Sequence, residues 1–137
     1  MSTIKVLMVR PQEKPQMKEV EFTQQIEQLL GGSIEIKTPF DENNVAMICN
    51  ADSDPKKQTM NRALFSDKKL RNVTEIISGA FLVAGIGDNG DFVSLTKQQL
   101  EKYSARFQKG EEFLLDENGN LRVARYDIKD APDGTSK

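Results

Sequence analysis

The sequence predicts an α+β domain: a mainly antiparallel sheet with two helices packed on one face, plus a C-terminal β-hairpin. Two observations support this fold class. Short alternating or apolar runs outnumber the segments with helical spacing. The connections between neighbouring runs are short and rich in turn residues, as in hairpins. A small curved or barrel-like sheet, with the helices closing one end, is the alternative architecture.

The N-terminal quarter contains three expected strands and one helix. Residues 3–9 alternate and are rich in β-branched side chains, which indicates a strand. Residues 18–22 form a short returning strand, and residues 24–30 have the apolar spacing of a helix. The glycines at 31–32 end this helix, because glycine accepts the left-handed conformation of a helix C-terminus. Residues 33–37 then alternate as a half-buried strand.

The middle of the chain contains the most apolar segments. Val45–Cys49 is a continuous apolar run and predicts a more deeply buried strand. Residues 50–60 have loop chemistry, and the sequence leaves the type of residues 61–65 open. Residues 73–77 lead into residues 80–86, which we expect to form a central strand because this is the most apolar stretch of the chain.

A second helix follows Thr96. Thr96 and Gln99 have the spacing of a capping box, in which each side chain bonds to the other residue's backbone N–H. Apolar residues recur on one face of this helix, and Gly110 closes it. The residues on that face are Leu95, Leu100, Tyr103 and Phe107.

The C-terminal region predicts a hairpin and a tail. Residues 111–115 and 121–126 flank a turn that contains Asn118-Gly119, the strongest short hairpin signal. We expect residues 1–128 to form a single domain, with 110–128 as a hairpin extension. Residues 129–137 are polar and are expected to be a flexible tail.

The composition excludes several classes of chemistry. The chain has 137 residues with no His, no Trp and one Cys, and its formal net charge is −2. Without His, imidazole-based catalysis and the usual zinc sites are not available. The small net charge does not favour nucleic acid or an anionic membrane as a partner. We therefore expect no enzyme, no catalytic residue, no cofactor and no metal, in a cytoplasmic protein without a signal peptide or membrane span.

Three motifs have both a chemical and a structural interpretation. Cys49 lies in an apolar run, which favours a buried hydrophobe over a reactive thiolate. Residues 85–90 spell GxGxxG, but the following residues read as extended, whereas dinucleotide binding requires a helix there. Asp116, Asn118 and Asn120 resemble half of a calcium loop, and we interpret them as a hairpin turn.

The carboxylate pairs Asp52 and Asp54, and Asp88 and Asp91, lie in loops that could hold a hard cation. The sequence does not show that their side chains converge, so a solvated loop is the favoured interpretation at both places.

The candidate binding residues are Asn61, Arg62, Arg122 and Arg125. Arg62 adjoins an apolar stretch, so its guanidinium either donates to loop carbonyls or anchors a partner. We favour the structural role for Asn61 and Arg62. Basic groupings such as Arg122 and Arg125 are diluted by nearby acids, and the two tyrosines are not interleaved with them, so nucleic-acid binding has no support.

A series of segments, taken in order over residues 4–107, resembles the family of the domain of unknown function numbered 3846. This family occurs in small proteins of phages, plasmids and conjugative elements, largely in Gram-positive bacteria. It has no established catalytic residues to transfer to this chain. The segments that carry the resemblance are Ile4–Leu7, Leu30–Glu35, Val45–Asn50, Asn61–Leu64, Ile76–Gly85, and Phe92–Thr96 with the helix to Phe107.

The resemblance implies an accessory protein of a mobile element. Such proteins commonly bind and inhibit host machinery, including restriction and CRISPR nucleases. We therefore expect a non-enzymatic protein that binds a host or defence-system protein in the host cytoplasm, as a counter-defence inhibitor. A nucleic-acid-binding accessory protein is the alternative. An enzyme built on carboxylates and a bound metal ranks last.

Overall fold

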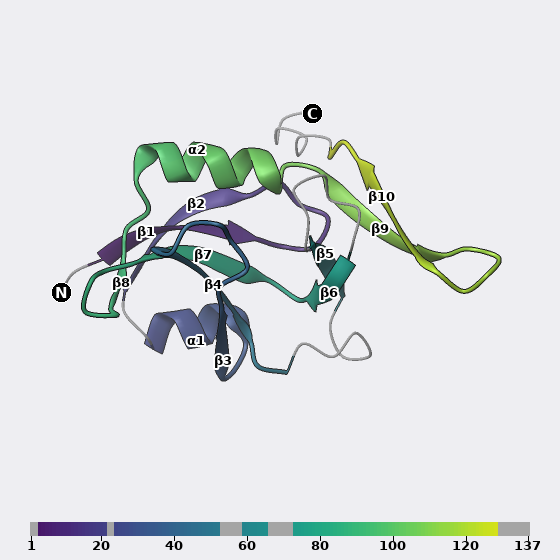
Figure 1. Cartoon of the computed structure of the whole chain (residues 1–137). Coiled ribbons are helices and arrows are strands. Elements are labelled where there is room, and N and C mark those ends of the chain that lie inside the picture. The colour runs from purple at the N-terminus through teal and green to yellow at the C-terminus, as the bar shows by residue number, and fades with distance from the viewer. Residues whose placement is uncertain (1–2, 22–23, 53–58, 66–72, 129–137) are drawn as a thin grey trace, which may run out of the picture.

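The computed structural model describes residues 3–21, 24–52, 59–65 and 73–128 (Figure 1). Predictions that involve Phe22, the Asp54 carboxylate or the tail at 129–137 lie outside these residues. Neither helix in the described part of the chain is long and apolar enough to cross a membrane.

The central sheet has the strand order β2-β1-β7-β4-β3, and every neighbouring pair is antiparallel. The five strands are β1 (Thr3–Val9), β2 (Gln16–Glu21), β3 (Ile34–Lys37), β4 (Val45–Asn50) and β7 (Phe81–Ile86). β7 lies between β1 and β4, and its first four residues are 0% exposed. The prediction of a central strand in the most apolar segment is therefore confirmed.

The other strands are short or form separate two-stranded sheets. β8 (Phe92–Val93) pairs with the end of β7. β5 (Met60–Phe65) pairs with β6 (Val73–Ser78), so the segment whose type the sequence left open is a strand. β9 (Gly110–Leu115) and β10 (Leu121–Tyr126) form the C-terminal hairpin, which projects from the body of the molecule in Figure 1.

The two helices, α1 (Gln24–Leu30) and α2 (Lys97–Arg106), lie on opposite faces of the sheet, below and above it in Figure 1. The expectation that both helices pack on one face is therefore wrong. The mainly antiparallel α+β class is confirmed.

Two separate groups of buried side chains show which helix covers which face. α1 contributes Ile26 and Leu30 to one group, and the strand residues of this group are Val6, Met8, Val20, Ile48, Leu82 and Ala84. Residues of α2 and its flanks (Leu95, Tyr103 and Phe107) and of the β5–β6 pair (Leu64 and Ile77) pack on the other face. The residues of the central sheet in this group are Leu7, Val9, Val45, Met47, Cys49, Phe81 and Val83.

The physical reason for this arrangement is the continuous apolar run in each inner strand. Successive side chains of a strand point to opposite faces, so a run without alternation places apolar groups on both sides. All six residues of β4 are buried, as are Val6–Val9 of β1. A sheet with such strands needs cover on both faces, and one helix therefore lies on each.

α2 begins as the sequence predicts. The Thr96 hydroxyl accepts a hydrogen bond from the Gln99 backbone N–H at 3.1 Å, and the Gln99 side chain accepts from the Thr96 N–H at 2.9 Å. The predicted capping box is thus confirmed. It fixes the start of the helix whose last residues lie beside the candidate site.

Cys49 is 0% exposed in β4, and its thiol lies 3.5 Å from the Glu35 carbonyl oxygen. Burial raises the pKa of this thiol to about 11. Because the thiolate is the reactive form, the interpretation of Cys49 as a buried hydrophobe is confirmed.

We expect Cys49 to be unreactive toward a thiol-specific disulfide reagent at pH 8 in the folded protein and to react stoichiometrically in guanidinium chloride. An Ile36→Cys variant in a Cys49→Ala background is the matched control, since Ile36 is 51% exposed on the neighbouring strand. Reaction of native Cys49 as fast as the control would contradict the buried, protonated thiol.

Candidate functional site

Asn61, at the start of β5, is a buried residue whose side chain bonds to two other segments of the backbone. It is 1% exposed, and its side-chain amide donates to the carbonyls of Val9 at 3.0 Å and Gly79 at 2.8 Å. Its side-chain oxygen accepts from Arg62 Nη1 at 2.7 Å. The end of β1 and the turn before β7 are therefore joined through one amide.

Arg62 is fully buried at 0% exposure. Its Nη2 donates to the carbonyl oxygens of Glu13 at 2.9 Å and Phe107 at 2.8 Å. Burial lowers the pKa of this guanidinium, and the negative charge of Glu111 opposes that shift. Arg62 thus connects β5 to the loop after β1 and to the end of α2.

The burial of Asn61 and Arg62 decides between their two interpretations. A fully buried guanidinium has no surface to offer a partner in this conformation, whereas donation to loop carbonyls is what the hydrogen bonds show. These contacts favour the structural role of Asn61 and Arg62, and their role in binding stays a prediction.

Arg125 lies where β10 meets the body of the molecule. Its Nε lies 3.4 Å from Glu111 Oε2, and its guanidinium lies 4.9 Å from the centre of the Phe65 ring. The Glu111 side chain is only 6% exposed, and its other oxygen accepts from the Ala63 N–H at 2.8 Å. Glu111 therefore anchors the hairpin to β5.

Arg106, in the last turn of α2, is a residue that the sequence analysis did not single out. Its guanidinium lies 5.2 Å from the centre of the Phe107 ring, and its buried Nε has no hydrogen-bond partner. Burial lowers the pKa of Arg106; Glu111 opposes that shift, and Arg125 adds to it. The negative charge of Glu111 thus acts on Arg62 and Arg106, and Glu111 forms an ion pair with Arg125. We call these four residues the arginine cluster.

The hairpin carries an apolar face beside the arginine cluster. The cross-strand pairs Glu111–Arg125, Phe113–Val123 and Leu115–Leu121 lie on the same side, because alternate pairs of a ladder share a face. Leu115 is 73% exposed and Leu121 is 37% exposed. We call the side with these three pairs the hairpin face.

Arg122 lies on the opposite side of the hairpin and bonds locally. Its Nε and Nη2 each lie 3.1 Å from Asp116 Oδ2. The other oxygen of Asp116 accepts from the backbone N–H groups of Asn118 and Asn120, both at 2.9 Å. These bonds lower the pKa of Asp116. The partial calcium motif is a hairpin turn, as predicted, and Arg122 and Arg125 do not converge.

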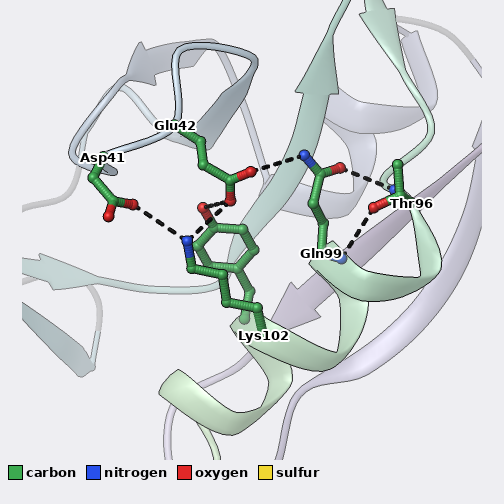
Figure 2. Close-up of polar contacts among 6 residues, drawn as sticks. Asp41, Glu42, Thr96, Gln99 and Lys102 are labelled. Atoms are coloured by element: carbon green, nitrogen blue, oxygen red, sulfur yellow. Dashed lines mark hydrogen bonds and ion pairs between the residues drawn. The ribbon is translucent and has the colours of Figure 1, made fainter.

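A second polar cluster joins the loop before β4 to α2 (Figure 2). The Tyr103 hydroxyl donates to Glu42 Oε1 at 2.6 Å, and Lys102 Nζ lies 3.1 Å from the same oxygen. Gln99 donates to Glu42 Oε2 at 3.3 Å, and Lys102 also contacts Asp41 at 3.3 Å. The hydrogen bond from Tyr103, then those from Gln99 and Lys102, lower the pKa of Glu42. The cluster holds the loop against the helix.

An open depression of about 540 Å³ lies at the end of α1. The Asn50 side chain at its wall donates to the Leu30 carbonyl at 2.8 Å and accepts from the Asp52 N–H at 2.7 Å. Asp52 borders the depression, whereas Asp54 lies outside the described residues. The lining residues are Leu30, Gly31, Gly32, Ser33, Asn50, Ala51 and Asp52.

The glycine-rich segment after β7 is a turn. Gly87 N–H donates to the Asp91 carbonyl at 2.8 Å, and the Asn89 amide donates to the Asp91 carboxylate at 2.9 Å. Strand β8 follows directly, so the helix that dinucleotide binding requires does not begin here. Within the described ranges, no three His, Cys, Asp or Glu residues converge to hold a metal ion.

Comparison with known families matches residues 4–108 to the Domain of unknown function (DUF3846). The chain belongs to the DUF3846 family. The match confirms the resemblance found in the sequence. No curated protein and no solved structure matches the chain.

The DUF3846 match ends just after α2, so it divides the arginine cluster. Arg62, Arg106 and the Phe107 carbonyl lie within the matched residues, whereas Glu111 and Arg125 follow them. The hairpin is thus additional to the matched domain in sequence, although its first residues are bonded to β5.

We expect Arg62→Ala to lower the free energy of unfolding by at least about 3 kcal/mol, because carbonyl groups that now accept from the guanidinium lose a buried donor. Denaturation in guanidinium chloride followed by far-UV circular dichroism measures the effect. Arg122→Ala is the control, with an expected change within about 0.5 kcal/mol because its side chain is 69% exposed. Equal changes in the free energy of unfolding for the two substitutions would contradict the structural role of Arg62.

The polar cluster of Asp41, Glu42, Gln99, Lys102 and Tyr103 predicts a contribution to stability that is lost at acid pH. A carboxyl whose pKa is lowered by folding stabilises the folded state above its unfolded pKa, and this contribution is lost as the pH falls through the folded value. We expect Glu42→Gln to cost about 1 kcal/mol at pH 7 and to flatten the loss of stability between pH 7 and pH 3. Glu101→Gln, at an exposed position on α2, should leave the profile unchanged. Parallel profiles of stability against pH for the wild type and Glu42→Gln would contradict a stabilising contribution from the Glu42 carboxylate.

Proposed function

We propose that the protein is a non-enzymatic accessory protein of a phage or other mobile element, and that it binds a host or defence-system protein through its C-terminal hairpin. A counter-defence inhibitor, of the anti-CRISPR or antirestriction type, is the specific role that this proposal favours. It would act in the host cytoplasm by covering a surface of its target.

The observation that carries the proposal is the exposed hairpin face. A two-stranded hairpin alone is marginally stable in water and normally gains stability from a third strand or a packed surface. Leu115 and Leu121 are exposed on this face, and Leu114 is 51% exposed on the other. Exposed apolar groups gathered on one projecting element are typical of an interaction surface.

The charge of the hairpin favours a protein partner over a nucleic acid. Residues 109–127 contain five acidic and three basic side chains, and the whole chain carries a net charge of −2. A polyphosphate backbone would be repelled by this balance. The family description names no function, so the proposal rests on the hairpin itself and on the mobile-element context of the resemblance.

The test compares capture of proteins from host lysate by tagged wild type, Leu115→Asp and Ile36→Asp, with nuclease present. Ile36 is the matched control, because it is an exposed apolar residue on β3 at 51% exposure. We expect one discrete protein to be captured by the wild type and by Ile36→Asp, and at least tenfold less by Leu115→Asp. This factor corresponds to about 1.4 kcal/mol of binding free energy.

Equal capture by all three proteins would exclude the hairpin face as the docking surface. Capture that nuclease abolishes would favour the alternative, a nucleic-acid-binding accessory protein. In that case the affinity for DNA or RNA would fall steeply with added salt.

A further inference from the structure

The two edges of the central sheet are the strands β2 and β3. Among the residues that the structure describes, no further strand pairs with the outer side of either. Such an edge presents a row of backbone N–H and C=O groups to which another strand can add. Each edge also carries one large exposed apolar side chain, Met17 on β2 at 52% and Ile36 on β3 at 51%.

The backbone of β3 directs the N–H and C=O groups of Ile36 away from the sheet. Ser33 and Ala51 continue the register of β3 with β4, and the Ala51 N–H donates to the Ser33 carbonyl at 2.8 Å. Opposite residues of an antiparallel ladder alternate between hydrogen-bonded and non-hydrogen-bonded pairs. The backbone groups of Glu35 and Lys37 therefore face β4, and those of Ile36 face the position of a further strand.

The side chains of β3 divide between the two faces of the sheet. Ile36 lies opposite Ile48, which belongs to the buried group that includes α1 residues. On the other face, Lys37 Nζ lies 2.9 Å from Glu75 and 3.5 Å from Glu35. Two carboxylates thus share one ammonium group, and the Glu35 side chain remains 49% exposed. A second lysine opposite Glu35 would give this carboxylate a partner of its own.

Two-fold symmetry limits how a second copy can add to this edge. An axis perpendicular to the sheet keeps each side chain on its own face, so opposite residues are separated by an even number of positions in the sequence. The two longest registers for β3 are therefore centred on Glu35 and on Ile36. The first opposes two glutamates. The second opposes Ile36 to its own copy in a hydrogen-bonded pair, and it opposes Glu35 to Lys37 on both sides of the axis.

We propose that a second copy of this chain pairs with β3 in the register centred on Ile36, so that the two central sheets form one continuous antiparallel sheet. The Glu35–Lys37 pairs are then non-hydrogen-bonded pairs, in which side chains lie closest. The two Ile36 side chains cover each other on the α1 face. The inference does not depend on the proposed function, because β3 lies far from the hairpin in Figure 1 and its pairing leaves the hairpin face uncovered.

The other edge of the sheet does not offer this complementarity. The two longest symmetric registers for β2 are centred on Lys18 and on Glu19, and each opposes like charges at the axis. Charge therefore selects β3 over β2, although Met17 and Ile36 are almost equally exposed.

We expect the dimer to be weak, because β3 has only four residues and Pro39, which lacks an N–H, follows closely. Such pairing buries less surface than a standard interface, and we expect a dissociation constant on the order of 0.1 mM. The monomer, with Ile36 exposed, therefore predominates in dilute solution.

Analytical ultracentrifugation of the full-length protein, from about 10 μM to about 1 mM, measures the dimer. We expect dimer formation by the wild type to rise with concentration. Glu35→Lys and Lys37→Glu should each weaken it at least about tenfold, because each opposes like charges across the axis. An equimolar mixture of these two variants should dimerise about as well as the wild type, since every opposite pair then joins unlike charges. Circular dichroism checks that both variants are folded.

Cysteine cross-linking locates the axis. In a Cys49→Ala background, Ile36→Cys places two thiols opposite each other on strands whose Cα atoms are about 5.5 Å apart, within the range of a disulfide. Mild oxidation of the concentrated protein should produce covalent dimers. Met17→Cys in the same background is the matched control on β2 and should remain monomeric.

Three results would overturn the β3 dimer: a wild type that stays monomeric at the highest concentration, an equimolar mixture that stays monomeric, or equal cross-linking through Met17→Cys and Ile36→Cys. Ile36→Asp separates this inference from the proposed function. It should abolish the dimer and retain lysate capture, whereas Leu115→Asp should retain the dimer and lose lysate capture.

Discussion

The buried positive charge of Arg62 is the constraint on which much of this fold depends. The Arg62 guanidinium can remain buried only while carbonyl oxygens from the loop after β1 and from the end of α2 stay in place. Asn61, the residue before it, joins the end of β1 to the turn that leads into β7. Two adjacent side chains thus satisfy backbone groups from four separate places in the chain. The small β5–β6 pair acquires its position against the sheet from these bonds and from the apolar contacts of Leu64 and Ile77.

The parts of the fold that depend on local chemistry were predictable. The capping box at Thr96, the Asn118-Gly119 hairpin turn and the central strand at 81–86 each carry their signal within a few residues. The placement of the helices on one face was predicted wrongly, because helical spacing shows that a face is apolar and does not show which side of a sheet it covers. The signal lay elsewhere, in the unbroken run Val45–Cys49, since a strand that is apolar on both sides requires two covering layers.

The candidate site was also predictable only in part, because some of its residues are brought together only by the tertiary fold. Arg62 stood out because a charged residue beside an apolar run needs an explanation, and Arg125 because it forms a basic grouping with Arg122, three residues before it. Arg106 gave no such sign, since an arginine in the last turn of a helix is ordinary. The charges of Glu111 and Arg125 act on its pKa, and both residues belong to a hairpin whose Glu111 is hydrogen-bonded to β5. Relations of this kind are tertiary, and spacing along the chain does not encode them.

The Glu111 side chain also bears on how such a protein can diversify. The hairpin follows the matched family domain, yet its second residue, Glu111, accepts a hydrogen bond from β5. Its first residue, Gly110, lies so close to the Tyr126 ring that a side chain there would require the ring to move. Substitutions at the base of the hairpin therefore disturb contacts of the folded structure, whereas Leu115 and Leu121 near the tip are exposed. Under the proposed function, substitutions at the tip would change what the hairpin binds without disturbing the scaffold beneath.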